Sequence, residues 1–126
     1  MRVWMVGIGL ALALGMPAQA MHRRSNDWKS PSDMIADCRV HTGADKLECE
    51  LTVQVGVAIK AVEDENGRRA CPPSIPADMT EAEGDLFRRG RIVEPVLKWI
   101  EAHPKALHGD WLAALDASAH DLWPCS

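Results

Sequence analysis

The sequence predicts an all-α fold, a small bundle of four to six short helices stapled by two disulfides. Three observations lead to this class. Apolar residues recur at helical spacing, proline and glycine separate the helical segments, and four cysteines are available for pairing in a chain of only 126 residues. A chain of this length forms one domain with a modest core, so covalent cross-links add useful stability.

The first twenty residues have the pattern of a secretory signal peptide. Arg2 supplies a positive charge, residues 3–16 are mostly apolar, and Ala18-Gln19-Ala20 places small residues at a cleavage site. We therefore expect residues 1–20 to be removed and the rest to work in the periplasm, without membrane insertion after cleavage, because no later segment is long and apolar enough to span. Cysteines in such an oxidising compartment form disulfides.

Residues 21–29 are polar and lack periodicity, so we expect a flexible N-terminal arm followed by a single helical domain over residues 30–126. Ser30 and Pro31 predict the first helix start, with serine as the N-cap and proline at the first helical position. This helix fades at residues 41–43.

A longer element is expected from Asp45, as its N-cap, to about Asp64. Helical i, i+4 and i+7 spacing is followed by Leu47, Leu51, Val55, Ala58, Ile59 and Val62. Every second residue from Val53 to Ile59 is also β-branched, which is typical of a strand. Periodicity therefore leaves helix and strand both open for this element.

The chain from Cys71 to Pro76 contains three prolines and is expected to be irregular. Thr80 and Glu83 have the spacing of a capping box, which predicts a short helix or an extended loop to about Arg89.

The clearest helix covers residues 91–102, with an apolar stripe on one side and Pro95 in about its first turn. Pro104 ends it. The last helix is expected from Asp110, as its N-cap, to Leu122.

Four cysteines allow three pairings, and their spacing does not decide among them. The chain organisation favours one. Cys38 ends the first helix and Cys49 opens the next, so an antiparallel helix pair brings them together. We therefore expect Cys38–Cys49 and Cys71–Cys125.

The charge balance excludes some partners. The signal peptide holds one of the fourteen basic residues and none of the eighteen acidic ones, so the mature chain carries a net charge of −5 with histidine neutral. This balance argues against nucleic acid and against an anionic membrane surface as partners.

The sequence offers no convincing catalytic or metal-binding constellation. His103, His108 and His120 lie near one another, but no pair has the i, i+4 spacing of two ligands on one helix face. No Gly-x-Ser-x-Gly elbow is present. We expect a protein that is not an enzyme and that uses no cofactor and no metal.

Two charged clusters are candidate partner-binding residues. Glu63, Asp64 and Glu65 form an acidic run at a turn, which either steers a basic partner or is simply solvated. Arg89 and Arg91, within Arg88-Arg89-Gly90-Arg91, form either an exposed docking element or charges that flank a helix. Trp99 and Trp111 are expected to be core or interface aromatics.

The C-terminal half resembles a known family. Gly90–Pro104, which reads GRIVEPVLKWIEAHP, is followed by Leu107-His108 and by Trp123-Pro124-Cys125. This order is similar to that of small periplasmic immunity proteins that protect bacteria against amidase effectors of type VI secretion. Cys49 and Cys71-Pro72 match weaker parts of the same pattern, whereas Met79–Arg89 corresponds to an insertion.

The resemblance implies an all-α, disulfide-stapled fold that often forms homodimers, and it favours helix for residues 45–64. It implies that the chain binds a cell-wall amidase effector and occludes its cleft, so that peptidoglycan stem peptides are spared. The alternative is a disulfide-stabilised periplasmic structural or adaptor protein with no toxin partner.

Overall fold

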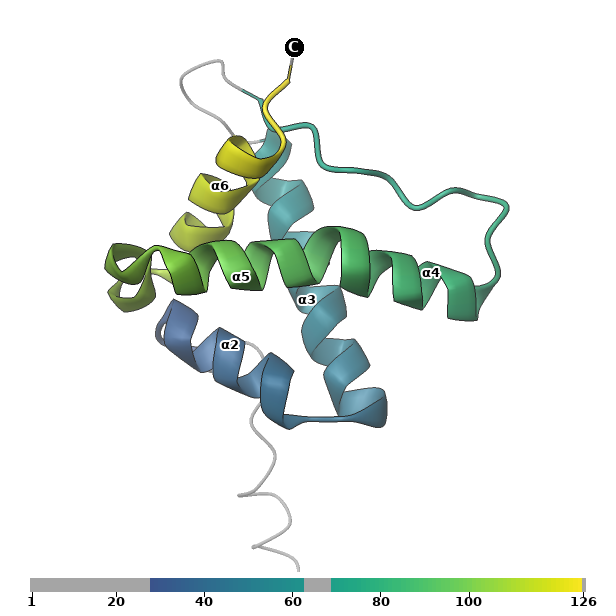
Figure 1. The fold of residues 1–126 in the computed structure, drawn as a ribbon, viewed down its shortest axis with the longest axis horizontal. Coiled ribbons are helices and arrows are strands. Elements are labelled where there is room, and N and C mark those ends of the chain that lie inside the picture. The colour runs from purple at the N-terminus through teal and green to yellow at the C-terminus, as the bar shows by residue number, and fades with distance from the viewer. Residues whose placement is uncertain (1–27, 63–68, 126) are drawn as a thin grey trace, which may run out of the picture.

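The computed structural model describes residues 28–62 and 69–125, and within these ranges the fold is helical (Figure 1). The elements are α2 (Pro31–Val40), α3 (Gly43–Val62), α4 (Glu81–Arg88), the π-helical turn η2 (Arg89–Val93), α5 (Glu94–Ala102), the 3-10 helix η3 (Pro104–His108) and α6 (Trp111–Leu122). The described residues contain no strand, and their β pairing is one isolated antiparallel bridge between Ala70 and Pro124. The predicted all-α class is confirmed, and the long second element is a helix.

The helices pack around one apolar core. In Figure 1 the rod formed by α4 and α5 crosses in front of α3, with α6 above the rod and α2 below it. α3 packs against α2 and α6, and α5 packs against α6. The fully buried apolar side chains at the centre are Met34, Val53, Val57, Val93, Val96, Leu97, Ile100, Leu115 and Ala119. In the described part of the chain, no helix is long and apolar enough to cross a membrane.

The start of α2 follows the prediction. The Ser30 hydroxyl accepts a hydrogen bond from the backbone N–H of Asp33 at 3.3 Å, and Pro31 occupies the first helical turn. Trp28 lies in the segment expected to be a loose arm, but it is buried, donates its indole N–H to Asp37 at 2.9 Å and meets Trp111 edge-to-face at 5.0 Å. The arm therefore does not extend to Trp28.

α3 begins at Gly43, two residues before the expected N-cap Asp45. Gly43 has φ +62°, a left-handed conformation that glycine adopts without a steric penalty. This conformation turns the chain sharply after α2, so α3 starts at once. Asp45 lies inside the first turn, where its negative charge suits the helix dipole.

The break expected near Arg89 does not exist, because α4, η2 and α5 form one continuous helix. The capping box that starts it is confirmed: Thr80 Oγ1 accepts from the Glu83 N–H at 3.2 Å, and Glu83 accepts from the Thr80 N–H at 3.0 Å. Pro95 lies inside this helix, where its ring would clash with a carbonyl one α-helical turn earlier. The wider π-helical turn contains Gly90 and ends at Val93, two residues before Pro95, so the helix passes both residues without ending.

Both predicted disulfides are present. Cys38–Cys49 joins the end of α2 to the first turns of α3, with Cα atoms 5.4 Å apart, and is buried. Cys71–Cys125 joins the irregular proline-rich segment to the C-terminal tail, with Cα atoms 5.2 Å apart. α6 follows Asp110 as expected, although the Asp110 side chain makes no capping hydrogen bond.

Candidate functional site

The most distinctive surface of the described fold lies on α3, which is apolar on two sides. Its buried side consists of Cys49, Glu50, Val53, Gly56, Val57 and Ala61. The opposite side exposes Leu51, Val55, Ile59 and Val62, at 40, 55, 46 and 81% of their surface. We call these four residues the α3 stripe. The helical spacing seen in the sequence therefore marks the exposed face of α3, and not the face that packs on the core.

The apparent strand alternation of residues 53–59 has the same origin. A helix that is apolar on two sides carries β-branched residues at many positions. Val53 and Val57 are buried in the core, whereas Val55 and Ile59 are exposed at the surface. Such a helix is expected in a fully buried position or at an interface. That double pattern was the sequence signal for this surface.

Beside the stripe lies a cleft of about 240 Å³ between α3, η2 and the proline-rich segment. Its lining residues are Gln54, Val57, Ala58, Pro72, Pro73, Ser74, Ile75 and Ile92. The lining combines apolar walls with the Gln54 amide and the Ser74 hydroxyl. A cleft of this kind accepts an apolar side chain and offers it few polar partners.

The proline-rich wall of this cleft is held at its start by the C-terminal tail. The Cys71 N–H donates to the Trp123 carbonyl at 2.7 Å, the Cys125 N–H donates to the Arg69 carbonyl at 3.4 Å, and the Cys71–Cys125 disulfide lies between these bonds. Pro72 and Pro73 follow directly and fix the backbone φ. The wall is therefore positioned covalently, without regular secondary structure.

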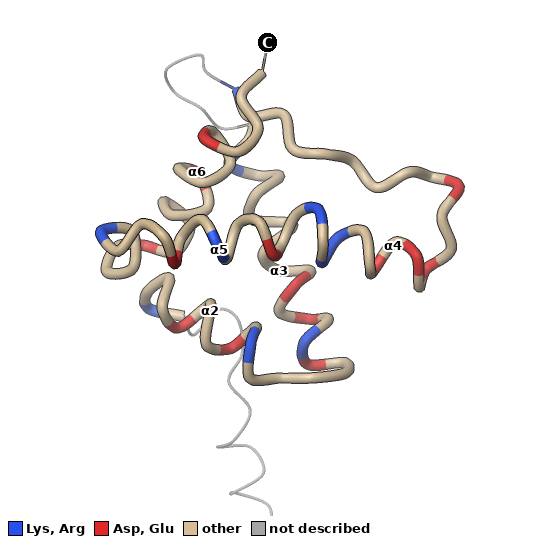
Figure 2. The backbone as a smooth tube through the Cα atoms, viewed as in Figure 1, with Lys and Arg blue, Asp and Glu red and all other residues tan. Residues whose placement is uncertain are grey.

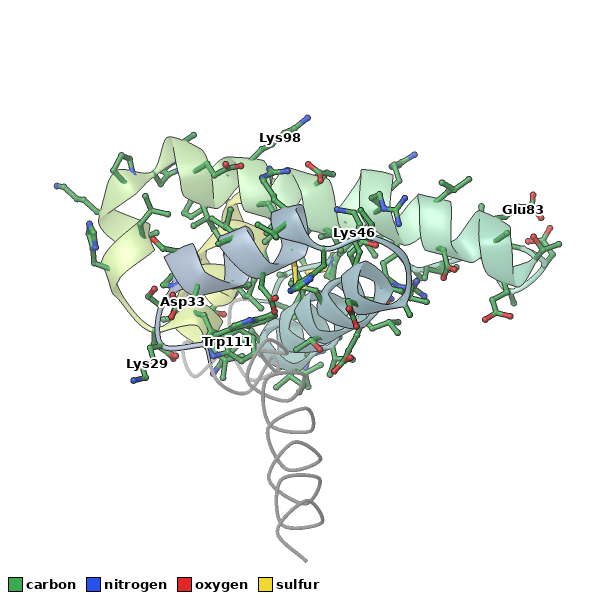
Figure 3. The ribbon with its side chains drawn as sticks, turned by 90° about the horizontal axis from the view of Figure 1, so that it is seen from below. Lys29, Asp33, Lys46, Glu83, Lys98 and Trp111 are labelled. Carbon is green, nitrogen blue, oxygen red and sulfur yellow. A yellow bond between two sulfur atoms is a disulfide. The ribbon has the colours of Figure 1, made fainter. Side chains whose placement is uncertain are left out.

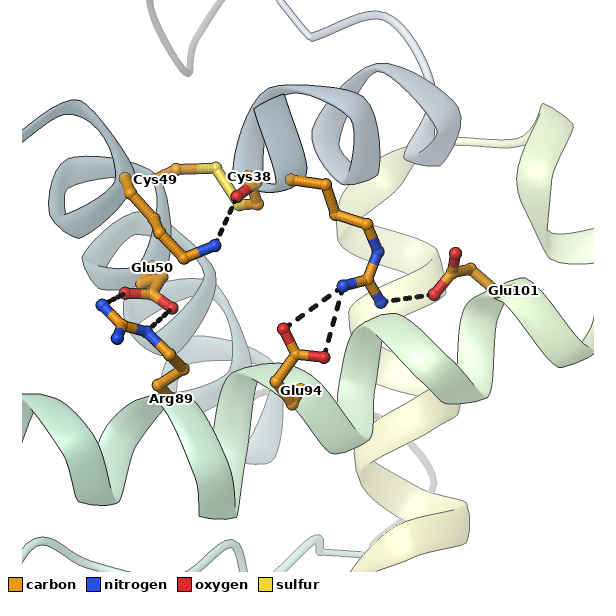
Figure 4. A network of polar contacts seen from close by, with 8 residues as sticks. Cys38, Cys49, Glu50, Arg89, Glu94 and Glu101 are labelled. Atoms are coloured by element: carbon orange, nitrogen blue, oxygen red, sulfur yellow. Dashed lines mark hydrogen bonds and ion pairs between the residues drawn. A yellow bond between two sulfur atoms is a disulfide. The ribbon is translucent and has the colours of Figure 1, made fainter. Parts of the chain in front are cut away.

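The predicted basic docking residues lie on the continuous helix. Arg89 donates to the carboxylate of Glu50 through Nε at 2.8 Å and Nη2 at 3.1 Å (Figure 4). The Glu50 side chain is 2% exposed, against 38% for Arg89. The hydrogen bond to Glu50 raises the pKa of the Arg89 guanidinium. Arg89 therefore neutralises a buried carboxylate from the surface.

The neighbouring arginines also have contacts within the chain. Arg88 donates to Gln54 and to Asp85, and the Arg91 guanidinium lies 5.4 Å from the centre of the Phe87 ring. Of the alternatives for this cluster, the structure therefore places Arg88, Arg89 and Arg91 along a helix and not on a loop. Glu63, Asp64 and Glu65, the predicted acidic run, lie outside the described residues.

A second ionic network joins α2 to α5 (Figure 4). Arg39 donates to Glu94 at 3.3 Å and to Glu101 at 2.6 Å, and Lys46 donates to the Cys38 carbonyl at 2.9 Å. The hydrogen bond to Glu101 is the main cause that raises the pKa of Arg39. The network ties the end of α2, where Cys38 lies, to its neighbours.

Trp99 and Trp111, the two tryptophans expected to be core or interface residues, lie at the edge of the core. Trp111 packs partly buried against it, beside the start of α2 where Lys29 and Asp33 lie (Figure 3). Trp99 donates to Asp121 at 2.6 Å and stacks on His103, with ring centres 3.8 Å apart. Among the residues that the structure describes, no group of three histidine, cysteine, aspartate or glutamate side chains is arranged to hold a metal ion.

Comparison with known proteins gives no match. No family model, no curated protein and no solved structure is similar to this chain at a significant level.

Proposed function

We propose that this chain is a periplasmic immunity-like protein that binds a cell-wall amidase effector and occludes it, protecting the cell against type VI secretion toxins. The signal-like first twenty residues and the C-terminal resemblance around Gly90–Pro104 and Trp123-Pro124-Cys125 support the proposal. The structural observation that carries it is the apolar cleft between α3 and the proline-rich segment.

The cleft suits an anchoring side chain of a protein partner. Interfaces derive most of their binding energy from a few large apolar or aromatic side chains that fill pockets, surrounded by contacts that exclude water. Val57, Ile75 and Ile92 provide such a pocket, and Cys71–Cys125 fixes its wall before the partner arrives. A pre-formed pocket costs little ordering entropy on binding.

The amidase is then inhibited because the bound domain covers it. An amidase loop that inserts an apolar side chain into the cleft brings the body of the domain over the rim of the enzyme. Peptidoglycan stem peptides no longer reach the amidase, and the immunity-like protein contributes no chemistry.

The test is co-expression with amidases encoded beside this gene, followed by pull-down, growth and inhibition assays. Ser74→Trp fills the cleft, whereas Ala77→Trp adds the same ring at an exposed position directly after this segment and outside the lining. We expect Ser74→Trp to weaken amidase binding at least tenfold and Ala77→Trp to leave it unchanged. A chain that neither binds nor protects against such an amidase is not its inhibitor, and the structural or adaptor alternative then stands.

A further inference from the structure

The two disulfides differ in their access to solvent. Cys38 and Cys49 are 0% and 2% exposed and belong to the core, whereas Cys71 and Cys125 are both exposed. A disulfide is opened by a thiolate that must reach one of its sulfur atoms, so accessibility decides which bond reacts. We propose that Cys71–Cys125 is a site of thiol–disulfide exchange with a dithiol reductant. Opening it releases the proline-rich wall of the cleft, while Cys38–Cys49 still joins α2 to α3.

The surroundings of the exposed bond favour an attacking thiolate. Residues 71–77 read CPPSIPA and residues 122–125 read LWPC, so both segments that carry the bond are uncharged. In Figure 2 the C-terminal tail and most of the proline-rich segment are accordingly tan, and an acidic position follows only farther along, towards α4. A thiolate is negatively charged and this chain is acidic overall, so a neutral approach avoids the repulsion that acidic surfaces impose.

The two thiols of the reductant balance the exchange. One thiolate of the dithiol attacks a sulfur atom of Cys71–Cys125, forms a mixed disulfide with it and expels the other cysteine as a thiolate. The second thiol of the dithiol then attacks the mixed disulfide and releases the remaining cysteine. Two electrons pass from the dithiol to the protein, and the two protons that the dithiol loses are those that the two cysteines gain.

Opening the bond frees the wall of the cleft and spares the core. Residues 71–80 all lie within the described part of the chain and include no buried residue, helix or strand. The core is formed by residues between Trp28 and Ala70 and between Ile92 and Ala119, so it does not draw on this segment. After reduction the segment is still tied to the tail by the two backbone hydrogen bonds beside the former disulfide. Such exposed bonds open readily, so the cleft loses its fixed side.

Reduction of the folded protein tests the exchange site. The purified oxidised chain is treated with dithiothreitol, quenched by alkylation at intervals and digested, and mass spectrometry gives the reduction rate of each disulfide. The buried bond reacts only when the domain opens, so we expect Cys71–Cys125 to be reduced at least about a hundredfold faster than Cys38–Cys49. In urea the two rates should become similar, because unfolding exposes both bonds. Equal rates in the folded protein, or faster reduction of Cys38–Cys49, overturn the proposal.

Amide hydrogen exchange tests the release of the wall. On reduction, exchange at the Cys71 and Cys125 amides should rise at least about tenfold, whereas exchange along α3 and α6 stays unchanged. The double variant Cys71→Ser with Cys125→Ser should match the reduced protein and should not respond to dithiothreitol. Unchanged exchange at the two amides shows that the wall is not released, and a rise along all helices shows that the bond holds the whole fold. Either result overturns the proposal.

Amidase binding extends the test to the cleft, and this step alone rests on the proposed function. Reduction should weaken binding of the amidase at least about tenfold, because a released wall must be ordered again on binding. Equal binding by the oxidised and reduced chains shows that the bond does not control the cleft. An amidase that binds neither form contradicts the proposed function, and the reduction rates and hydrogen exchange then decide the exchange site by themselves.

Discussion

Replacing Arg89 by methionine should destabilise the fold through the residue it leaves behind. Methionine keeps much of the aliphatic volume and removes the guanidinium. The Glu50 side chain, 2% exposed, then loses the donors that contact its carboxylate at 2.8 and 3.1 Å. Leaving one partner of a buried ion pair uncompensated costs about 3–5 kcal/mol. Arg89 itself is 38% exposed, so water enters from its side and the cost falls to about 2–3 kcal/mol.

Urea unfolding measured by circular dichroism tests this value. In thermal unfolding, a loss of about 2–3 kcal/mol lowers the melting temperature of a domain of this size by roughly 10 °C. Arg91→Met is the matched control, because Arg91 lies on the same helix and stacks on Phe87, a contact that contributes about 0.5–1 kcal/mol at an exposed site. The double variant Glu50→Leu with Arg89→Met should recover most of the lost stability, since no buried charge remains. Equal stability of the Arg89→Met and Arg91→Met proteins would refute the reasoning and return Arg89 to the list of candidate partner contacts.

Two further predictions concern helix packing and capping. A Cβ at Gly56 would lie 2.6 Å from Leu115 Cδ1 in the core, so Gly56→Ala should lose about 1–3 kcal/mol of stability to overpacking and regain about 1 kcal/mol through helix propensity. At Gly84 the nearest atom to an added Cβ is 3.6 Å away, so Gly84→Ala should gain about 0.5–1 kcal/mol. Urea unfolding compares the two variants, and equal stabilities would contradict the close approach of α3 and α6. The backbone hydrogen bond from Thr80 lowers the pKa of Glu83, so the stabilisation of the α4 start is complete above pH 4.5 and is lost as the pH falls through the lowered pKa. Amide chemical shifts of residues 80–84 should report this loss on acid titration, and Glu83→Gln, which keeps the acceptor but cannot titrate, should show no such step.

The features that followed from the sequence are those set by local chemistry. Ser30, and Thr80 with Glu83, act as caps because their side chains accept hydrogen bonds from backbone N–H groups within three residues. Pro31 suits the first helical position because the N–H that it lacks has no partner there. The Cys38–Cys49 pairing could also be predicted from the sequence, because consecutive antiparallel helices bring their facing ends together.

The features that could not be predicted from the sequence depend on tertiary packing. The sequence predicts one element that ends near Arg89 and a separate helix from Arg91, yet a π-helical turn joins the two, because Ile92, Val93 and Val96 on that segment are buried in place. The sequence also could not reveal which apolar side of α3 meets the core. The cleft could not be predicted from the sequence, because it exists only where Cys71–Cys125 places the proline-rich segment opposite α3.

The pairing of the four cysteines has a consequence for biogenesis. The bonds join the first cysteine to the second and the third to the fourth. On the proposed export to the periplasm, a thiol oxidant that joins cysteines in the order in which they emerge from a translocation channel therefore produces the native bonds directly. Mixed or crossed disulfides, which need thiol exchange to be corrected, are bypassed. Oxidative maturation of this chain then requires an oxidase and places little demand on a disulfide isomerase.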